Sequence, residues 1–288
     1  HQHPLRVPAS PSLKPVKQLL AAADAVLAVG SQLGPTDFDI YSTGDPVPLS
    51  HLIRVDIDPQ QLQRHPADIR LQGRAQDILP LLIKGLSPVP ATGTWGESKA
   101  KAVCTAARAE LPPGYAHMVE MVETIRDTLP GSIIVGDSTQ PVYAANLYYG
   151  HDNPRGWFNA SVGFGTLGYA IPAAIGACLA EPGRQVVCIT GDGGAQFTLP
   201  EMMTARDENL PVIFLIWNNF GFQEIADAMT DAHIAPMGCH PRPPKFAYIA
   251  RAYDMLYARC HNGVSDLEKT LRAHADLQQP VLIEIQTR

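Results

Sequence analysis

The stretch GDGGAQFTLPEMMTARDENLPVIFLIWNN occupies residues 191–219 and decides the fold of this chain. It follows an apolar run at 185–190 that is typical of a buried strand, and it contains a helical pattern at 199–208 and a second apolar strand at 211–217. A strand, a helix and a strand in this order predict a parallel sheet, whose ligands bind beyond the carboxyl ends of the strands. Polar residues follow both of these predicted strand ends.

The same alternation continues on both sides of this stretch. Four further segments have the periodicity of helices or of buried strands: 118–129, 132–136, 169–180 and 281–285. The strand at 132–136 opens onto a polar run at 137–140, and GFGTLG at 163–168 leads into the small-residue helix. Residues 113–288 are therefore predicted to form one α/β domain, in which helices flank a parallel sheet.

The amino-terminal part repeats this pattern over fewer elements. Helices are predicted at 16–23 and 76–86, and strands at 25–30 and 51–58. Residues 1–86 are therefore predicted to be part of a second, Rossmann-like α/β domain. Residues 87–112 combine a stretch rich in Pro, Gly and Thr with an Ala-rich helix, which predicts a linker and a connecting helix.

Composition excludes several classes of protein. The chain has 288 residues, of which 45% are hydrophobic and 17% charged, so a folded chain is expected. Its net charge of −6 gives no electrostatic reason to bind nucleic acid or an anionic membrane. The five cysteines form no CxxC pair, which argues against a disulfide framework or a zinc cluster. Because no signal or membrane-spanning pattern is found, a cytoplasmic location is expected.

Three residues beyond the two central strands carry the oxygen donors that magnesium prefers. Asp192 offers a carboxylate, Asn219 a side-chain oxygen and Gly221 a backbone carbonyl. Mg²⁺ accepts few protein ligands when diphosphate oxygens complete its octahedron, and the glycines beside Asp192 let backbone N–H groups approach a phosphate. Each motif alone is also typical of an ordinary turn, which is the alternative interpretation.

Together these motifs resemble the cofactor-binding motif of thiamine diphosphate enzymes, in which GDG is followed by NN after a helix and a strand. Asn219 follows Asp192 by 27 residues, the spacing expected of that family. SVGFGTLGYAIPAAIGA at 161–177 resembles the family's stretch that holds the two rings of the cofactor. ADAVLAVGSQLG at 23–34 and HLIRVDIDP at 51–59 resemble its middle domain. The resemblance covers nearly the whole chain and implies the thiamine diphosphate-binding fold.

The resemblance also implies roles for residues by their position. It implies that Asp192, Asn219 and the Gly221 carbonyl bind Mg²⁺. Leu167 is implied to prop the folded cofactor, with an ordinary core leucine as the alternative, and the Gly165 carbonyl to accept a hydrogen bond from its amino group. The residues implied to bind thiamine diphosphate are Ser138, Thr139, Gln140, Gly165, Thr166, Leu167, Gly191, Asp192, Gly193, Gly194, Asn219 and Gly221.

One part of the family's machinery has no counterpart in the sequence. In this family a glutamate of a separate pyrimidine-binding domain activates the cofactor, and no segment here resembles that domain, so no catalytic residue is assigned. We expect the chain to be the second part of a longer enzyme, completed by a missing segment or by another subunit, in a homodimer or homotetramer. FAD is not expected, because GSQLGPTDFDIY at 30–41 lacks the arginine-bearing segment of flavin-binding relatives.

The subfamily is indicated by two segments. FGFQEIADAM at 220–229 is closer to simple 2-oxo-acid decarboxylases than to acetolactate synthases, which carry an insertion there. GDSTQPVYAANLYY at 136–149 most resembles 5-guanidino-2-oxopentanoate decarboxylases. A guanidinium substrate would pair with a carboxylate, for which Asp137 and Glu224 are candidates, although either is alternatively structural or solvated. An acetolactate synthase-type carboligase and a non-catalytic module of the same family remain the alternatives.

Overall fold

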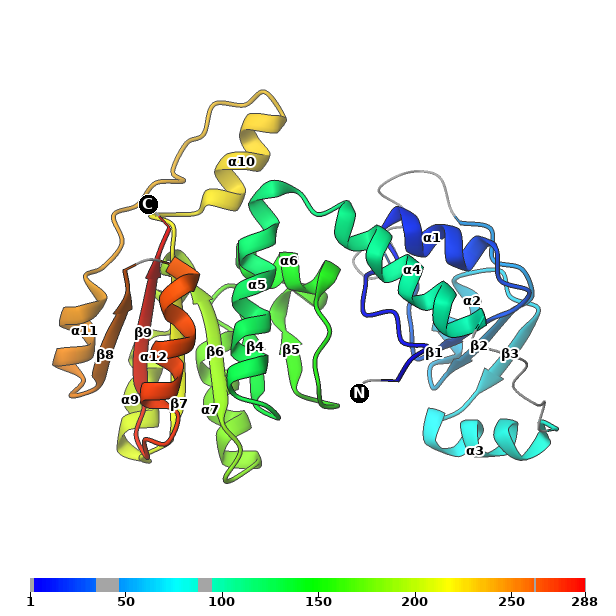
Figure 1. Ribbon diagram of the computed structural model, residues 1–288, viewed down its shortest axis with the longest axis horizontal. Coiled ribbons are helices and arrows are strands. Elements are labelled where there is room, and N and C mark those ends of the chain that lie inside the picture. Colours follow the sequence, from blue (N-terminus) through cyan, green and yellow to red (C-terminus); the bar gives the residue numbers. More distant parts are fainter. Residues whose placement is uncertain (1–2, 35–46, 88–94, 262, 288) are drawn as a thin grey trace. The chain divides into compact units, whose positions relative to one another are not determined.

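Figure 1 shows the computed structural model of the chain, which describes residues 3–34, 47–87, 95–261 and 263–287. The chain divides into two compact units between Leu111 and Pro112. Each unit is built around its own parallel sheet. The predicted α/β fold class is therefore confirmed.

The carboxyl-terminal unit contains a six-stranded parallel sheet in the order β5-β4-β6-β7-β9-β8. Its strands are β4 (Ile133–Gly136), β5 (Trp157–Asn159), β6 (Val186–Gly191), β7 (Val212–Asn218), β8 (Leu256–Cys260) and β9 (Val281–Gln286). Every residue of β4 and β7 is buried. Continuous apolar strands of this kind are expected where helices cover both faces of a parallel sheet.

Helices cover both faces of this sheet (Figure 1). One face packs against α7 (Ala170–Ala180), α9 (Met202–Asp207) and α11 (Phe246–Ala252) in a single apolar cluster. The other is covered by α5 (Pro113–Thr128), α6 (Gln140–Tyr148) and α12 (Leu267–His274), of which α5 contacts both of the others. The remaining helical segments are α8 (Asp192–Ala195), α10 (Gln223–Asp231), η1 (Ala160–Val162), η2 (Leu199–Glu201) and η3 (Gly263–Asp266).

The amino-terminal unit has a three-stranded parallel sheet in the order β1-β2-β3. Its elements are α1 (Lys14–Ala21), β1 (Val26–Val29), β2 (Leu52–Asp56), α2 (Pro59–Gln63), β3 (Ile69–Gln72), α3 (Ala75–Gly85) and α4 (Trp95–Ala109). Helix α4 packs against α1. The segment used above to argue against FAD, residues 30–41, lies largely outside the described residues, so that expectation stays a prediction.

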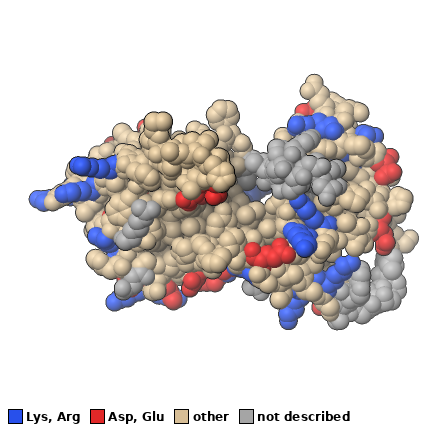
Figure 2. Space-filling view, turned by 90° about the horizontal axis from the view of Figure 1, so that it is seen from above, with Lys and Arg blue, Asp and Glu red and all other residues tan. Residues whose placement is uncertain are grey.

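Two properties of the described residues agree with the composition of the chain. Within the described ranges, none of the helices combines the length and the apolar character that crossing a lipid bilayer requires. On the face drawn in Figure 2, uncharged atoms cover most of the surface, and basic and acidic side chains both occur, as the modest net charge of −6 leads one to expect.

Candidate functional site

The expected site residues gather at the carboxyl ends of three neighbouring strands, β4, β6 and β7. The turns that follow these strands surround a cavity of about 230 Å³. All the residues expected to bind the cofactor line it except Thr166 and Asp192. Parallel neighbours deliver their carboxyl ends to one edge, which is why segments far apart in the sequence meet here.

The Asn219 side-chain amide lies beside two oxygen atoms at one end of this cavity. One terminal atom of the amide is 3.1 Å from Asp192 Oδ1 and 2.9 Å from the Gly221 carbonyl oxygen, and without an ion the NH₂ group at this position donates to both. A half-turn of the amide places its oxygen at the same point. Oxygens that share an octahedral Mg²⁺ at about 2.1 Å are separated by about 3 Å, so these separations fit a shared cation.

The carboxylate of Asp192 is buried and incompletely satisfied. The residue is 1% exposed, and its Oδ2 atom has no hydrogen-bond partner among the described residues. Burial raises the pKa of this carboxyl to about 6, although nearby backbone N–H groups oppose the rise. A buried anion that is only partly hydrogen-bonded is costly, and the charge of a bound cation would compensate this cost.

The turn after β7 depends on a glycine at 221. Phe220 and Gly221 both have positive φ, of 65° and 143°. A Cβ atom at position 221 would lie 2.4 Å from the carbonyl oxygen of Cys239, which itself accepts a hydrogen bond from the backbone N–H of Phe222. Only glycine combines this backbone with this approach, and the Gly221 carbonyl is thereby fixed beside Asn219.

Asp137 ties together three segments that surround the cavity. It is fully buried, and its carboxylate accepts from the backbone N–H of Ser138 at 2.8 Å, from that of Gly168 at 3.0 Å and from the Thr190 hydroxyl at 3.0 Å. Burial raises the pKa of this carboxyl, and these hydrogen bonds oppose the rise. Its oxygens are therefore engaged inside the protein, which removes Asp137 from the candidates for binding a cationic substrate.

The segment expected to hold the cofactor rings is only partly in the cavity. Leu167 and Gly165 line it, and Gly165 has a φ of 73°. Thr166 is exposed and does not line the cavity, so its contact with a cofactor stays a prediction. The turn is anchored at Gly168, whose carbonyl accepts from the Thr198 hydroxyl at 2.8 Å.

Glu224 supplies the carboxylate that is accessible from the cavity. It is half-buried on α10, and burial raises the pKa of its carboxyl while a hydrogen bond with Gln140 opposes the rise. Residues that the sequence reasoning missed also line the cavity: Tyr143, Phe222, Gln223 and Ile225. Tyr143 lies on α6, and the other three lie at or just before the start of α10. Neither helix was predicted there, although the apolar spacing at 223–231 was an available signal.

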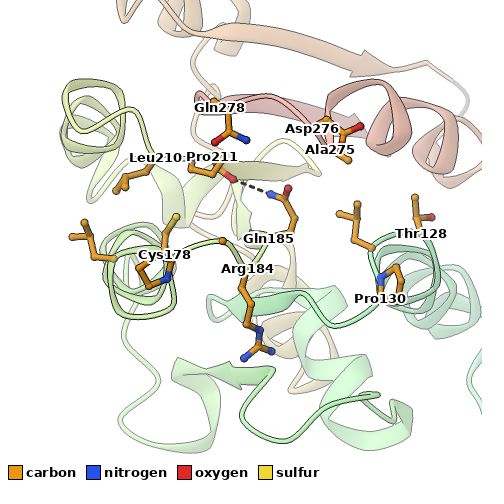
Figure 3. Close-up of a pocket in the computed structure, with 14 residues that line it drawn as sticks. Thr128, Pro130, Cys178, Arg184, Gln185, Leu210, Pro211, Ala275, Asp276 and Gln278 are labelled. Atoms are coloured by element: carbon orange, nitrogen blue, oxygen red, sulfur yellow. Dashed lines mark hydrogen bonds between the residues drawn. The ribbon is translucent and has the colours of Figure 1, made fainter.

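A larger cavity lies at the opposite edge of the same sheet. It has a volume of about 710 Å³ and is lined by residues that precede β6, β7 and β9, including Arg184, Gln185 and Pro211 (Figure 3). Gln185 donates to the Pro211 carbonyl oxygen at 2.8 Å, so this polar group is already paired (Figure 3). None of the expected site residues lines this cavity. We therefore place the candidate site at the smaller cavity, because its residues offer oxygen donors for a cation, although its volume is smaller.

The donor set is unlike a cluster of acidic or sulfur ligands. Among the residues for which the structure gives positions, no group of three His, Cys, Asp or Glu side chains is placed to hold a metal ion. The convergence at Asp192 uses one carboxylate, one amide and one carbonyl, which is a set suited to a hard cation that also binds ligand oxygens.

Comparison with protein families identifies both parts of the chain. Residues 137–285 match the description "Thiamine pyrophosphate enzyme, C-terminal TPP binding domain", and residues 1–82 match "Thiamine pyrophosphate enzyme, central domain".

Curated proteins also match. The chain is 37% identical over 290 residues to "Probable 2-ketoarginine decarboxylase AruI" of Pseudomonas aeruginosa. The alignment covers 98% of this chain and 50% of that protein. It is 31% identical to the acetolactate synthase large subunit of Haemophilus influenzae and to the acetolactate synthase isozyme 3 large subunit of Escherichia coli, over 68% of this chain and 35% of each relative. The chain thus spans about half the length of the first relative, and the matched residues make up about a third of each of the other two.

Proposed function

Because this chain belongs to the family of thiamine pyrophosphate enzymes, we propose that it carries the diphosphate- and magnesium-binding half of an enzyme that removes CO₂ from a 2-oxo acid without oxidation. The observation that carries the proposal is the convergence of Asp192 Oδ1, the Asn219 side-chain amide and the Gly221 carbonyl at the edge of the cavity. These groups carry the three oxygens expected to hold Mg²⁺.

In this proposal, different residues that line the cavity bind different parts of the cofactor. The backbone N–H groups of Gly193 and Gly194 at the start of α8, together with the turn at 138–140, hold the diphosphate. Leu167 and Gly165 orient the rings. Bound thiamine diphosphate supplies a nucleophilic carbon and an electron sink for the loss of CO₂.

A second domain or subunit is needed to complete the site. The family's activating glutamate has no counterpart in the chain, and these curated relatives are about twice as long. We infer that the pyrimidine-binding domain comes from elsewhere in a longer chain or from another subunit, in a homodimer or homotetramer.

The substrate we favour carries a guanidinium group. The relative with 37% identity is named a probable 2-ketoarginine decarboxylase, and 5-guanidino-2-oxopentanoate is that 2-oxo acid. Glu224 is the carboxylate accessible from the cavity, since Asp137 is engaged inside the protein. A carboxylate that pairs with a guanidinium through two hydrogen bonds gives both affinity and specificity.

Product analysis of the full-length protein tests the reaction. With thiamine diphosphate, Mg²⁺ and 5-guanidino-2-oxopentanoate, we expect CO₂ and the corresponding aldehyde. A 2-hydroxy ketone as the main product would instead show a carboligase of the acetolactate synthase type. Absence of Mg²⁺-dependent thiamine diphosphate binding in calorimetry would show a non-catalytic module and overturn the proposal.

Substitution of Glu224 tests the substrate. We expect Glu224→Gln to raise KM for the guanidino acid by about tenfold or more, because a charge-assisted pair is lost, and to leave KM for an uncharged 2-oxo acid of similar length nearly unchanged. The exposed Glu268→Gln serves as the matched control. An equal effect on both substrates would contradict the assignment of Glu224 to the guanidinium.

A further inference from the structure

A second buried carboxylate, Glu284 on β9, lies behind the cation-binding turn. Glu284 is 4% exposed and faces the end of β7, the neighbouring strand. Its Oε1 atom accepts from Asn218 Nδ2 at 2.6 Å and from Gln286 Nε2 at 2.9 Å, and its Oε2 atom accepts from the Tyr257 hydroxyl at 2.5 Å. All three partners donate, so both oxygens of this carboxylate act as acceptors.

Asn218 connects Glu284 to the turn that follows β7 through hydrogen bonds. Its side-chain oxygen accepts from the backbone N–H of Phe220 at 3.2 Å, and its backbone carbonyl accepts from Thr287 N at 3.1 Å. The Phe220 bond closes the turn in which Asn219 and Gly221 present their oxygens. Asn218 is 2% exposed, so water does not compete for these groups.

The chemistry of the pair explains why a carboxylate stands at 284. An asparagine amide has two orientations that differ by a half-turn, and only one of them directs its oxygen at the Phe220 N–H. A carboxylate only accepts hydrogen bonds, so it binds the Asn218 NH₂ group and selects that orientation. A glutamine at 284 can turn its own amide and pair with either orientation, which removes the selection.

We propose that Glu284 is a positioning residue, which orients Asn218 and thereby fixes the turn that presents the Asn219 and Gly221 oxygens to the cation. This inference rests on the proposed function, because it assumes that the turn binds a divalent cation. Glu284 itself touches neither the cavity nor the three converging oxygens.

The test measures metal binding directly in the full-length protein. Free Mn²⁺ is followed by electron paramagnetic resonance at saturating thiamine diphosphate, and the unfolding midpoint is measured separately without metal. We expect Glu284→Gln to weaken Mn²⁺ binding by about 10-fold, the range seen when groups that orient metal ligands are changed. The matched control, exposed Glu268→Gln, is expected to bind Mn²⁺ within about twofold of the native protein, because it removes the same charge at the surface.

A reciprocal exchange provides the rescue. In the double variant Asn218→Asp with Glu284→Gln, the glutamine NH₂ group donates to the new carboxylate, whose other oxygen still accepts from the Phe220 N–H. The net charge is that of the native protein, and Mn²⁺ affinity is expected to return to within about threefold of native, a residual of the size of one weakened hydrogen bond.

The outcomes separate this inference from the proposed function. If the native protein binds no Mn²⁺ with thiamine diphosphate, the proposed function fails and this inference with it. If the native protein binds Mn²⁺ and Glu284→Gln binds it equally well, the positioning role alone is overturned. Should Glu284→Gln not fold, Asn218→Ala leaves the carboxylate in place and breaks the same link, and native affinity in that variant overturns the inference as well.

Discussion

Replacement of Asp192 by asparagine is expected to stabilise the metal-free protein while it abolishes cation binding. Asp192 is 1% exposed, its Oδ2 atom has no hydrogen-bond partner in the part of the chain that the structure describes, and burial raises the pKa of its carboxyl from 3.8 to about 6. At about 1.4 kcal/mol for each tenfold change, this rise corresponds to about 3 kcal/mol of destabilisation when the folded protein carries the ionised carboxyl.

The sign of the pH dependence follows from this shift. The folded state binds the Asp192 proton more tightly than the unfolded state does, so the penalty is absent below about pH 4 and complete above about pH 7. The advantage of Asp192→Asn without metal should therefore grow as the pH rises through this range. With Mg²⁺ and thiamine diphosphate the order should reverse, because only the native site gains binding free energy.

Unfolding midpoints of the full-length protein measure both effects. In excess EDTA near pH 8, the variant is expected to melt several degrees above the native protein, since a unit of this size shifts by about 2–4 °C per kcal/mol. Exposed Asp207→Asn is the control for a change of net charge and should leave the midpoint within about a degree. Equal midpoints of native protein and Asp192→Asn in EDTA near pH 8 would refute the inference that the buried, ionised Asp192 carboxylate destabilises the metal-free protein.

Two further substitutions test the turn after β7 and the pH dependence of stability. Gly221→Ala places a Cβ atom 2.4 Å from the Cys239 carbonyl oxygen at a φ of 143°, so it should cost about 1–3 kcal/mol of unfolding free energy and weaken Mn²⁺ binding. The control Gly176→Ala, in open space on α7, should instead stabilise the protein by about 0.5–1 kcal/mol. Native Mn²⁺ affinity in Gly221→Ala would contradict this reasoning. Burial lowers the pKa of His151, so the unfolded state binds its proton more readily and stability should fall as the pH drops below about 6.5. His151→Gln, compared in the Asp192→Asn background, should flatten this dependence in unfolding midpoints, and an unchanged slope would exclude His151 as its source.

Elements with continuous apolar runs could be predicted from the sequence. The strands predicted at 185–190 and 211–217 are observed as β6 and β7, because a strand buried on both faces needs apolar residues at every position. The edge strands β3, β5 and β8 were not predicted, since they are only partly buried and lack a continuous apolar run. The helix predicted at 199–208 is divided into η2 and α9.

The candidate site, like the fold, could be predicted from the sequence only in part. The GDGG and NN motifs indicated the cation-binding residues because their spacing reflects a strand, a helix and a strand, and the structure brings Asp192 and Asn219 within 3.1 Å. Asp137 was considered as a substrate ligand, and its sequence position alone gave no sign of the three donors that enclose it. Glu284 was not singled out at all, because its meaning depends on which strand lies beside β9.

The sequence by itself determined the α/β class, the family and the order of the motifs along the chain, since these depend on local periodicity and on residue types at fixed spacing. Only the tertiary structure decided which carboxylates are buried and which face the cavity. Strand order places β9 beside β7 and so sets Glu284 against Asn218, while Gly168 and Thr190 enclose Asp137. Hydrogen bonds between residues so far apart in sequence are fixed by packing, and no short pattern along the chain encodes them.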